Sequence, residues 1–172
     1  MQKDIGKFGI SGKRDRTITN EDPYHPEEGL KEPAICDGCG ALYRNRRWQL
    51  DAQAAEVESA NPEVSRVSCP ACQKIAEKYP EGVVTLRGAY LWEHEEEIRN
   101  ILRNEESRAM SQNPLQRIMR MEREGDELII ETTEQKLAER LGKVLHRAHQ
   151  GALSVTWSDD HRLCRVGWER LL

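Results

Sequence analysis

Four of the five cysteines stand in two pairs with the spacing Cys-x-x-Cys: Cys36 with Cys39, and Cys69 with Cys72. A turn with this spacing presents two thiolates to one ion, and a structural zinc ion takes four such ligands in a tetrahedron. The sequence therefore predicts that Cys36, Cys39, Cys69 and Cys72 bind one structural zinc ion. A four-thiolate iron site is the metal alternative that these residues leave open.

A catalytic zinc ion needs an open coordination position and usually a His or Glu ligand, whereas four thiolates close the shell. The fragment His94-Glu95-Glu96 has the His-x-Glu form of a zinc deaminase but lies after the cysteines instead of ahead of them. The chain also has no Gly-rich phosphate loop and no serine nucleophile motif. We therefore expect no enzymatic activity and no small-molecule substrate.

The fifth cysteine, Cys164, stands near His161 in a segment with the pattern of a strand and a tight turn. A thiol and base pair would need a third group that orients the base, and no such group is evident. We expect Cys164 to be a half-buried strand residue that takes no part in metal binding.

Arginines and aromatic residues are densest directly after the first cysteine pair, at Tyr43, Arg44, Arg46, Arg47 and Trp48. Arginine suits phosphate contacts and planar rings suit base stacking, so these five residues are the predicted RNA-binding residues. The alternative is a solvated ribbon edge with Trp48 packed on the zinc turn. A second row, at Arg117, Arg120 and Arg123, is expected to lie on a sheet face and form ion pairs of little energetic value.

Residues 33–80 are predicted to form a zinc ribbon that contains an inserted helix. The helix is indicated by apolar residues at roughly helical spacing (Trp48, Ala52, Ala55 and Val57) and by the stop signal Asn61-Pro62. Residues 1–32 are rich in Gly and Pro and change from basic to acidic along their length. They are expected to form an extended, disordered arm, or one that becomes ordered on a partner.

Residues 81–172 show longer elements. A strand is predicted at 82–91, a helix at 93–110, and a hairpin of 115–124 with 127–133. A second helix, capped by Thr133, is expected to end near Gly151, and a second hairpin pairs 152–157 with 162–168. The fold class is thus α+β: a zinc ribbon followed by a ferredoxin-like βαββαβ sandwich with one extra strand.

The chain of 172 residues is 33% charged and has a formal net charge of −4. This charge excludes a uniformly basic nucleic-acid binder, so any contact with RNA must be local. No stretch approaches the roughly 18 apolar residues of a membrane span, and the N-terminus lacks the apolar region of a signal peptide. Because paired cysteines without a disulfide framework suit a reducing compartment, we expect a cytoplasmic protein that does not enter a membrane.

Three segments, CDGCGALYRNRRW, VSCPACQK and ELIIETTEQKLAERLGKVLHRAHQGALSVTW, support a family resemblance. With them, residues 33–168 resemble the zinc-ribbon N-terminal part of the large ribosomal subunit export adaptor family of archaea and eukaryotes, and its small bacterial relatives. The resemblance implies attachment to ribosomal RNA or to a ribosomal protein surface, with the ribbon as an anchor. The family carries further Cys-x-x-Cys pairs and later domains that this chain lacks, so nuclear export is not transferred.

The residues and the resemblance together predict a non-enzymatic zinc-binding protein that associates with the ribosome or another structured RNA. The alternative is a protein–protein interaction adaptor in which the zinc ribbon is purely structural.

Overall fold

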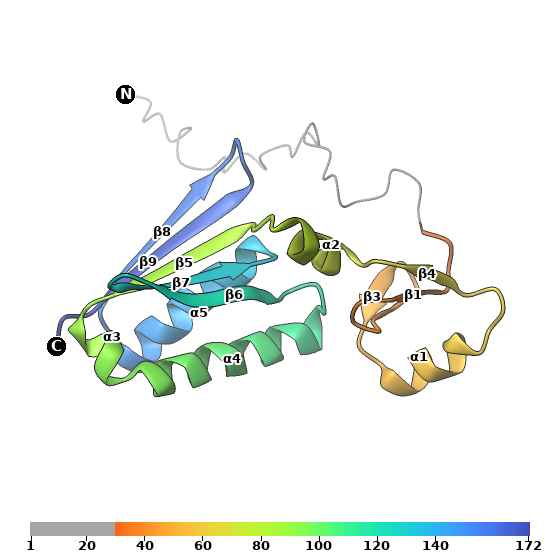
Figure 1. Cartoon of the computed structure of the whole chain (residues 1–172), viewed down its shortest axis with the longest axis horizontal. Helices are drawn as coiled ribbons and strands as arrows, with labels where there is room; N and C mark the ends of the chain where they lie inside the picture. The colour runs from red at the N-terminus through yellow and green to blue at the C-terminus, as the bar shows by residue number, and fades with distance from the viewer. Residues whose placement is uncertain (1–29) are drawn as a thin grey trace, which may run out of the picture.

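The computed structural model describes residues 30–172, which form two β-sheets with helices (Figure 1). A small four-stranded sheet carries the cysteine pairs, and a five-stranded mixed sheet is packed against helices. The predicted α+β class and the position of the cysteine pairs in a small N-terminal sheet are confirmed.

The predicted arm at 1–32 lies outside the described residues except for its last three. Leu30 packs against the small hydrophobic cluster around the cysteines. The carboxylate of Glu32 accepts a hydrogen bond of 2.6 Å from the backbone N–H of Arg46. These two contacts attach residues 30–32 to the ribbon.

The small sheet has the strand order β3-β2-β1-β4. Its strands are β1 (Ala34–Cys36), β2 (Leu42–Arg44), β3 (Arg47–Gln49) and β4 (Ser65–Val67), and β4 runs parallel to β1. The inserted helix α1 (Ala52–Ser59) joins β3 to β4 and begins at Asp51, whose carboxylate accepts a hydrogen bond from the Ala54 N–H. The strand β1 is therefore central and ends at the first metal-binding cysteine.

The helix predicted inside the ribbon is present, but Trp48, whose spacing with Ala52, Ala55 and Val57 indicated that helix, lies outside it. Trp48 belongs to β3, and α1 contains no buried residue. Val57 is 73% exposed. The Asp51 cap and a run of good helix formers favour this short helix.

Helix α2 (Pro70–Glu77) begins at the second cysteine pair, with Cys69 as its N-cap and Cys72 in its first turn, and it lies between the two sheets in Figure 1. It ends at Lys78, which adopts the left-handed conformation and returns its N–H to the carbonyls of Ile75 and Lys74. The chain then enters the larger sheet.

The larger unit contains five strands and three helices. The strands are β5 (Gly82–Arg87), β6 (Ile118–Glu124), β7 (Glu127–Thr132), β8 (Ala152–Ser158) and β9 (Leu163–Glu169). The helices are α3 (Ala89–Glu93), α4 (Glu95–Gln112) and α5 (Gln135–His149). This sequence of elements follows the prediction, except that the first expected strand is shorter and a short helix, α3, precedes α4.

The sheet order β6-β7-β5-β9-β8 shows where the extra strand lies. In a ferredoxin-like sheet the strand that follows the second helix would pair with β5, but here β9 occupies that place and runs parallel to β5. The burial patterns explain the exchange. Strand β9 buries Cys164, Val166 and Trp168, whereas β8 buries no residue completely and forms the edge. The stronger apolar alternation of β9 favours the central position.

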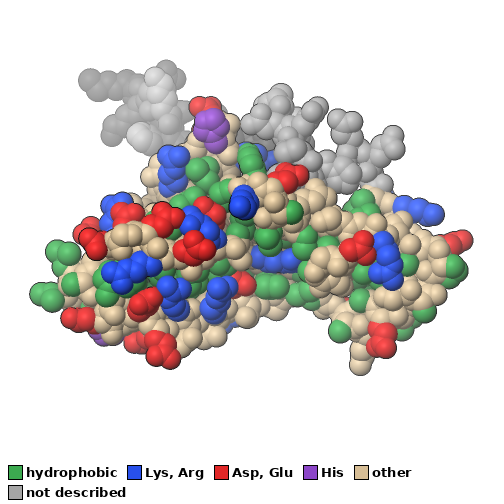
Figure 2. Space-filling view, viewed as in Figure 1, with side chains coloured by type: hydrophobic (Ala, Val, Ile, Leu, Met, Phe, Trp, Pro, Cys, Tyr) green, Lys and Arg blue, Asp and Glu red, His purple; other side chains and the backbone are tan. Residues whose placement is uncertain are grey.

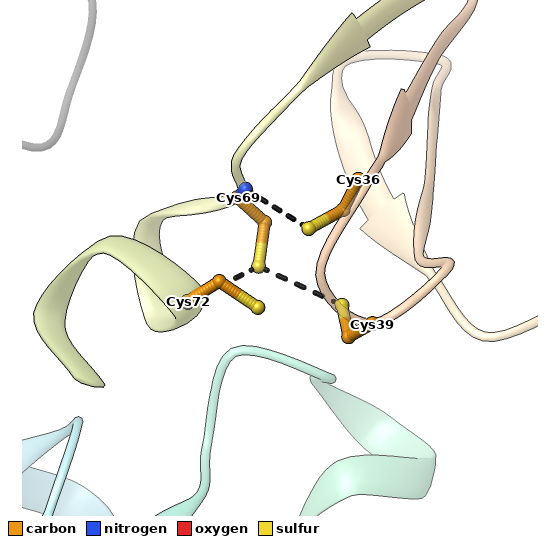
Figure 3. A group of neighbouring side chains, drawn as sticks. All are labelled: Cys36, Cys39, Cys69 and Cys72. Atoms are coloured by element: carbon orange, nitrogen blue, oxygen red, sulfur yellow. Dashed lines mark hydrogen bonds between the residues drawn. The ribbon is translucent and has the colours of Figure 1, made fainter. Parts of the chain in front are cut away.

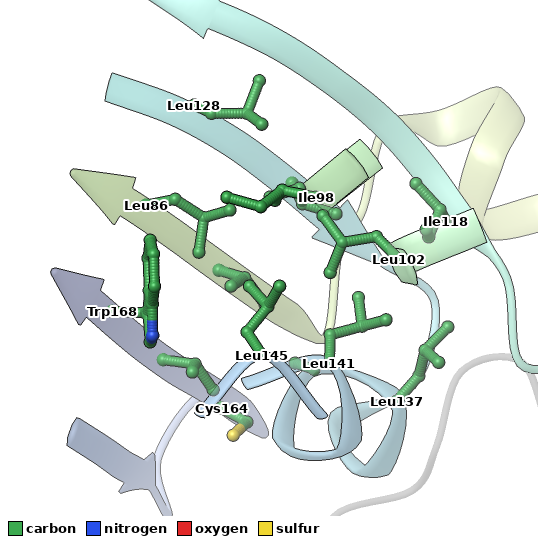
Figure 4. Packing of buried hydrophobic residues seen from close by; sticks show 14 of the residues in the cluster. Leu86, Ile98, Leu102, Ile118, Leu128, Leu137, Leu141, Leu145, Cys164 and Trp168 are labelled. Carbon is green, nitrogen blue, oxygen red and sulfur yellow. The ribbon is translucent and has the colours of Figure 1, made fainter. Parts of the chain in front are cut away.

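Helices α4 and α5 cover one face of this sheet (Figure 1). Figure 4 shows their leucines and isoleucines meeting the inward side chains of the central strands. From α5 come Leu137, Leu141 and Leu145, and from α4 come Ile98 and Leu102, all completely buried. Burial of each such side chain contributes about 1.5–3 kcal/mol. The larger unit therefore has a hydrophobic core that does not depend on the ribbon.

Acidic and basic side chains are interspersed over the face of the larger unit in Figure 2, and neither sign covers it continuously. Within residues 30–172, no helix has the length and apolar character needed to cross a lipid bilayer.

Candidate metal centre

The four predicted ligands converge on one point (Figure 3), with their sulfur atoms all within 4.8 Å of one another. The sulfurs of Cys39 and Cys69 are 3.8 Å apart. A tetrahedral ion with metal–sulfur bonds of about 2.3 Å places its ligands roughly 3.8 Å apart, so this donor set fits one zinc ion without rearrangement of the backbone. The prediction of a four-cysteine metal site is confirmed at the level of geometry.

The first cysteine pair lies in a tight turn between β1 and β2. The Cys36 carbonyl accepts a hydrogen bond from the Gly40 N–H at 2.9 Å, and Gly40 has a φ of +76° that favours glycine. Gly38 is needed for a different reason. A Cβ atom there would lie 2.9 Å from the sulfur of Cys72, so a side chain would press on the opposite ligand.

The second pair lies at the N-terminus of α2. Cys69 is the N-cap, and its sulfur accepts a hydrogen bond from the Cys72 N–H at 3.4 Å. The N–H of Cys69 donates to the sulfur of Cys36 at 3.2 Å. Pro70 occupies the first helical turn, where its fixed φ suits the helix and no N–H is required. The helix dipole and these amides favour negative charge on the sulfurs.

Burial and hydrogen-bond donors act in opposite directions on the pKa of the thiols of Cys36, Cys69 and Cys72. At Cys36 burial raises the pKa, but the backbone amides of Cys69, Cys39 and Gly38 outweigh it and lower the pKa from 9.0 to about 7. At Cys69 and Cys72 burial prevails and raises the pKa. A cation between the sulfurs would supply the positive charge that stabilises all four as thiolates.

Arg117 approaches this cluster from the larger unit. Its Nη2 lies 2.9 Å from the Cys39 sulfur, and its Nη1 lies 3.3 Å from the Cys72 sulfur. Burial alone would lower the pKa of this guanidinium, but the hydrogen bonds to Cys39 and Cys72 outweigh burial and raise the pKa further. The centre therefore contains a cation of the protein beside its four sulfurs.

This role of Arg117 differs from the prediction, in which Arg117, Arg120 and Arg123 lie on one sheet face. Arg117 precedes β6, whereas Arg120 and Arg123 lie within that strand. Residues three apart cannot all share one face of a strand whose side chains alternate with a period of two. By that alternation Arg120 is separated from Arg117 and Arg123, and no spacing in the sequence singles out Arg117.

The other two arginines of the row are engaged within the larger unit. Arg120 forms ion pairs with three carboxylates, those of Glu122 at 3.0 Å, Glu124 at 2.7 Å and Glu131 at 3.1 Å. Arg123 lies over the ring of Trp92, 4.0 Å from its centroid. The expected ion pairs are thus present at Arg120.

The five predicted RNA-binding residues lie on the β2–β3 hairpin, but their exposure differs. Tyr43 and Trp48 are directly opposite on the two strands, with ring centroids 5.2 Å apart. Trp48 is only 9% exposed and packs with Cys36 and Cys69 in the ribbon core. This burial matches the alternative in which Trp48 supports the zinc turn, and it leaves little ring surface for stacking on a base.

The three arginines lie at the tip of the same hairpin. Arg44 and Arg47 are paired across the strands, and Arg46 is in the turn. Asn45 and Arg46 have φ values of 56° and 61°, the pattern of a type I′ turn. Among residues 30–172, no carboxylate forms an ion pair with Arg44, Arg46 or Arg47.

Cys164 lies in the core of the larger unit and not among the four sulfurs. It is completely buried, not half-buried as predicted, because β9 is a central strand. Burial raises the pKa of its thiol from 9.0 to about 11, with a smaller contribution from the negative charge of Glu139.

Comparison of the chain with models of protein families, with curated proteins and with solved structures found no match. The resemblance to the export adaptor family therefore stays a prediction from the three segments that carry it. The four-cysteine centre is consistent with a zinc-ribbon-like site.

Proposed function

We propose that this chain is a non-enzymatic zinc protein in which a closed four-cysteine centre holds an arginine-bearing hairpin for contact with ribosomal or another structured RNA. The observation that carries the proposal is the combination of four converging sulfurs with a neighbouring hairpin tip whose three arginine side chains form no ion pair within residues 30–172.

The geometry of the sulfurs supports a structural ion over a catalytic one. Four thiolates fill a tetrahedral zinc shell, so no coordination position is left for a water molecule or a substrate. Backbone amides and Arg117 donate hydrogen bonds to the sulfurs, and these donors stabilise negative charge on the sulfurs. None of these groups is a base placed to activate a nucleophile.

The hairpin tip supports an anionic partner. Like charges directly opposite on paired strands are destabilising, and Arg44 faces Arg47 in this way. Arg46 occupies a position of positive φ where glycine would cost less, and its positive charge is exposed. A phosphate backbone would compensate the three charges at once, because guanidinium groups bind phosphate oxygens in a bidentate manner.

The metal centre gives this tip a fixed geometry. Trp48 belongs to the hairpin and packs against Cys36 and Cys69, so the ribbon core that the metal would stabilise is continuous with the strands that carry the arginines. Tyr43 is half-buried beside Trp48 and keeps part of its ring accessible. In this proposal Tyr43 is the aromatic residue available to a base, and Trp48 is its support.

The metal is tested first. Protein purified under reducing conditions should contain one zinc ion per chain by elemental analysis, and Cys36→Ser or Cys72→Ser should abolish that stoichiometry. Iron in place of zinc would change the identity of the ion and keep the four-cysteine centre. Absence of any stoichiometric metal would overturn the proposal.

The RNA contact is tested by salt dependence. Each arginine that neutralises a phosphate releases counterions, so replacing Arg44, Arg46 and Arg47 by Ala should flatten the slope of log affinity against log salt by about two to three units. A matched control removes the same charge elsewhere, at the exposed Arg103, Arg108 and Arg147 of the two long helices. Equal slopes for both triple variants, measured on ribosomal RNA fragments, would exclude the hairpin tip as the contact.

A protein partner is the second candidate, and strand β8 favours it. This edge strand, ALSVTWS, carries no charged residue over seven positions, and Trp157 is 46% exposed. The opposite edge, β6, carries Arg120, Glu122, Arg123 and Glu124, which protect it against pairing. An uncharged edge suits an added strand from a partner. Loss of ribosome association on Thr156→Pro, with the arginine variants unaffected, would favour this candidate.

A further inference from the structure

The side chain of Arg117 is buried without a carboxylate partner. The residue is 8% exposed, and none of the ion pairs within residues 30–172 includes it. Its Nε donates to the carbonyl of Pro114 at 2.9 Å, and both terminal nitrogens point to the sulfurs of Cys39 and Cys72. Burial of a guanidinium is costly unless a negative group compensates it. Within the described chain, the cysteine sulfurs are the only groups in contact with this guanidinium that a bound metal ion would hold as anions.

The charge of a filled centre complements this guanidinium. Four thiolates around a divalent cation have a net charge of −2, and two of the sulfurs belong to buried cysteines. Water therefore cannot fully solvate that charge, and an adjacent positive group lowers its energy. Arg117 and the metal cluster each reduce the cost of burying the other.

Arg117 is itself held by the larger unit. Its N–H donates to the Thr133 hydroxyl at 2.9 Å, and its carbonyl accepts from the Thr133 N–H at 2.9 Å. The Thr133 carbonyl in turn accepts from Nζ of Lys74 at 3.1 Å. Lys74 lies in α2, the helix that begins at Cys69. The sulfurs are thus connected to the larger unit through Arg117 on one side and through α2 on the other.

We propose that Arg117 is a positioning residue of the metal centre, which compensates the charge of the four-thiolate cluster and thereby makes metal binding and docking of the ribbon on the larger unit one coupled event. The proposal rests on the metal centre argued above, and it adds a residue from outside the ribbon to that centre. A neutral side chain of similar length in place of Arg117 would leave the charge of the cluster uncompensated. A lysine would restore the charge without the planar, forked geometry.

The test compares Arg117→Gln and Arg117→Lys with Arg120→Gln in the full chain. Arg120 is the matched control, because it is an arginine of the same segment whose partners are carboxylates. Zinc affinity is measured by competition with a chromophoric chelator. Loss of an outer hydrogen-bond partner should weaken zinc binding about ten- to a hundred-fold in Arg117→Gln, with partial recovery in Arg117→Lys and less than a three-fold change in the control.

A spectroscopic signature separates charge compensation from simple support of the fold. With Co²⁺ in place of Zn²⁺, the sulfur-to-metal charge-transfer band of Arg117→Gln should shift relative to wild type, because the sulfurs of Cys39, Cys69 and Cys72 each lose a hydrogen bond. The band of Arg120→Gln should not shift. Zinc should also increase hydrogen-exchange protection at Thr133 in wild type and fail to do so in Arg117→Gln.

Unchanged zinc affinity and an unchanged cobalt spectrum in a folded Arg117→Gln variant would overturn the inference and leave the metal centre intact. Wild-type protein that binds neither zinc nor cobalt would overturn the metal centre and this inference together. If Arg117→Gln does not fold, Arg117→Lys decides: a shifted cobalt band supports the inference, and wild-type affinity with a wild-type band overturns it.

Discussion

At the level of single residues, the backbone conformation of Arg46 favours glycine, whereas the proposed phosphate contact needs the arginine side chain. Its φ of 61° follows Asn45 at 56°, the pair of positive values that a type I′ hairpin turn requires. Glycine is the residue that meets this requirement at the second position at the lowest cost. An arginine there lowers hairpin stability and places an exposed positive charge in the β2–β3 turn.

Arg46→Gly should therefore change stability and RNA affinity in opposite directions. The Asn-Gly turn should stabilise the ribbon by about 0.5–1 kcal/mol, since strain is relieved at a compatible position. RNA affinity should fall, and the salt slope should decrease by about one unit. Chemical denaturation and fluorescence anisotropy measure the two quantities. Arg162→Gly, at another positive φ in the β8–β9 turn, is the control that should leave RNA affinity unchanged.

The second prediction at this scale concerns the reactivity of Cys164. A pKa of about 11 leaves roughly a thousandth of this thiol as thiolate at pH 8, compared with about a tenth at the ordinary value of 9.0. Iodoacetamide at pH 8 should thus alkylate the four site cysteines soon after zinc is chelated, and Cys164 only after global unfolding. Peptide mass spectrometry follows each residue. Rapid labelling of Cys164 in folded protein would show that β9 opens.

At the scale of elements, helix α2 connects the metal centre to the larger unit through a buried ion pair. Nζ of Lys74 lies 3.2 Å from the carboxylate of Glu81, and both side chains are at least 95% buried. Lys74 also approaches Glu134 at 3.8 Å. Because buried charges need their partners, removal of one partner costs more than removal of both.

Lys74→Ala should consequently destabilise the larger unit by about 3–5 kcal/mol, because it leaves Glu81 buried without its partner. The double variant Lys74→Met with Glu81→Met should recover part of that loss. Lys143→Ala, which removes an exposed pair with Glu139, should change stability by less than about 1 kcal/mol. Urea denaturation of the three variants tests this order. A double variant less stable than Lys74→Ala would contradict it.

The elements of the larger unit were predictable where one local signal controlled each of them. A β-branched apolar run located β5, apolar runs beside turn signals located β7 and β9, and helical spacing placed Ile98 and Leu102 on the buried face of α4. The neighbours of each strand were not predictable in this way. Both hairpin strands after α5 could have paired with β5, and the choice of β9 depends on how Trp168 and Val166 pack against helices that are distant in sequence.

The start of α5 shows why a local signal can mislead. Thr133 was expected to cap this helix, but the helix begins at Gln135 after Glu134, and no side chain caps it. The Thr133 hydroxyl instead accepts from the Arg117 N–H in the junction beside the metal centre. The four ligands were predictable because their spacing encodes them. Arg117 was not, because its role depends on a contact between segments 78 residues apart.

At the scale of the whole molecule, the ribbon and the larger unit share buried polar contacts but have separate hydrophobic clusters. One cluster contains Cys36, Trp48 and Cys69, and the other contains the leucines of α4 and α5 with the central strands. Leu115, from the loop before β6, packs against the ribbon cluster. The metal centre therefore lies where the ribbon meets the larger unit, and the segments around Arg117 and Thr133 contact both.

Removal of zinc should accordingly produce three levels of hydrogen exchange. Amides of β1, β2 and β3 should lose protection completely, because four cysteines and Trp48 are a small core without a metal. The N–H groups of Arg117 and Thr133 should lose part of their protection, since Arg117 then has no anionic cluster to bind. Amides of β5, β7 and α5 should stay protected, because their leucine core is complete without the ribbon. Exchange measured by mass spectrometry with and without a zinc chelator gives all three levels in one experiment.

Two outcomes would contradict this expectation. Changes confined to residues 33–77 would show that the segments around Arg117 and Thr133 are independent of the metal. Loss of protection throughout β5 and β7 would show that the larger unit cannot hold its fold alone.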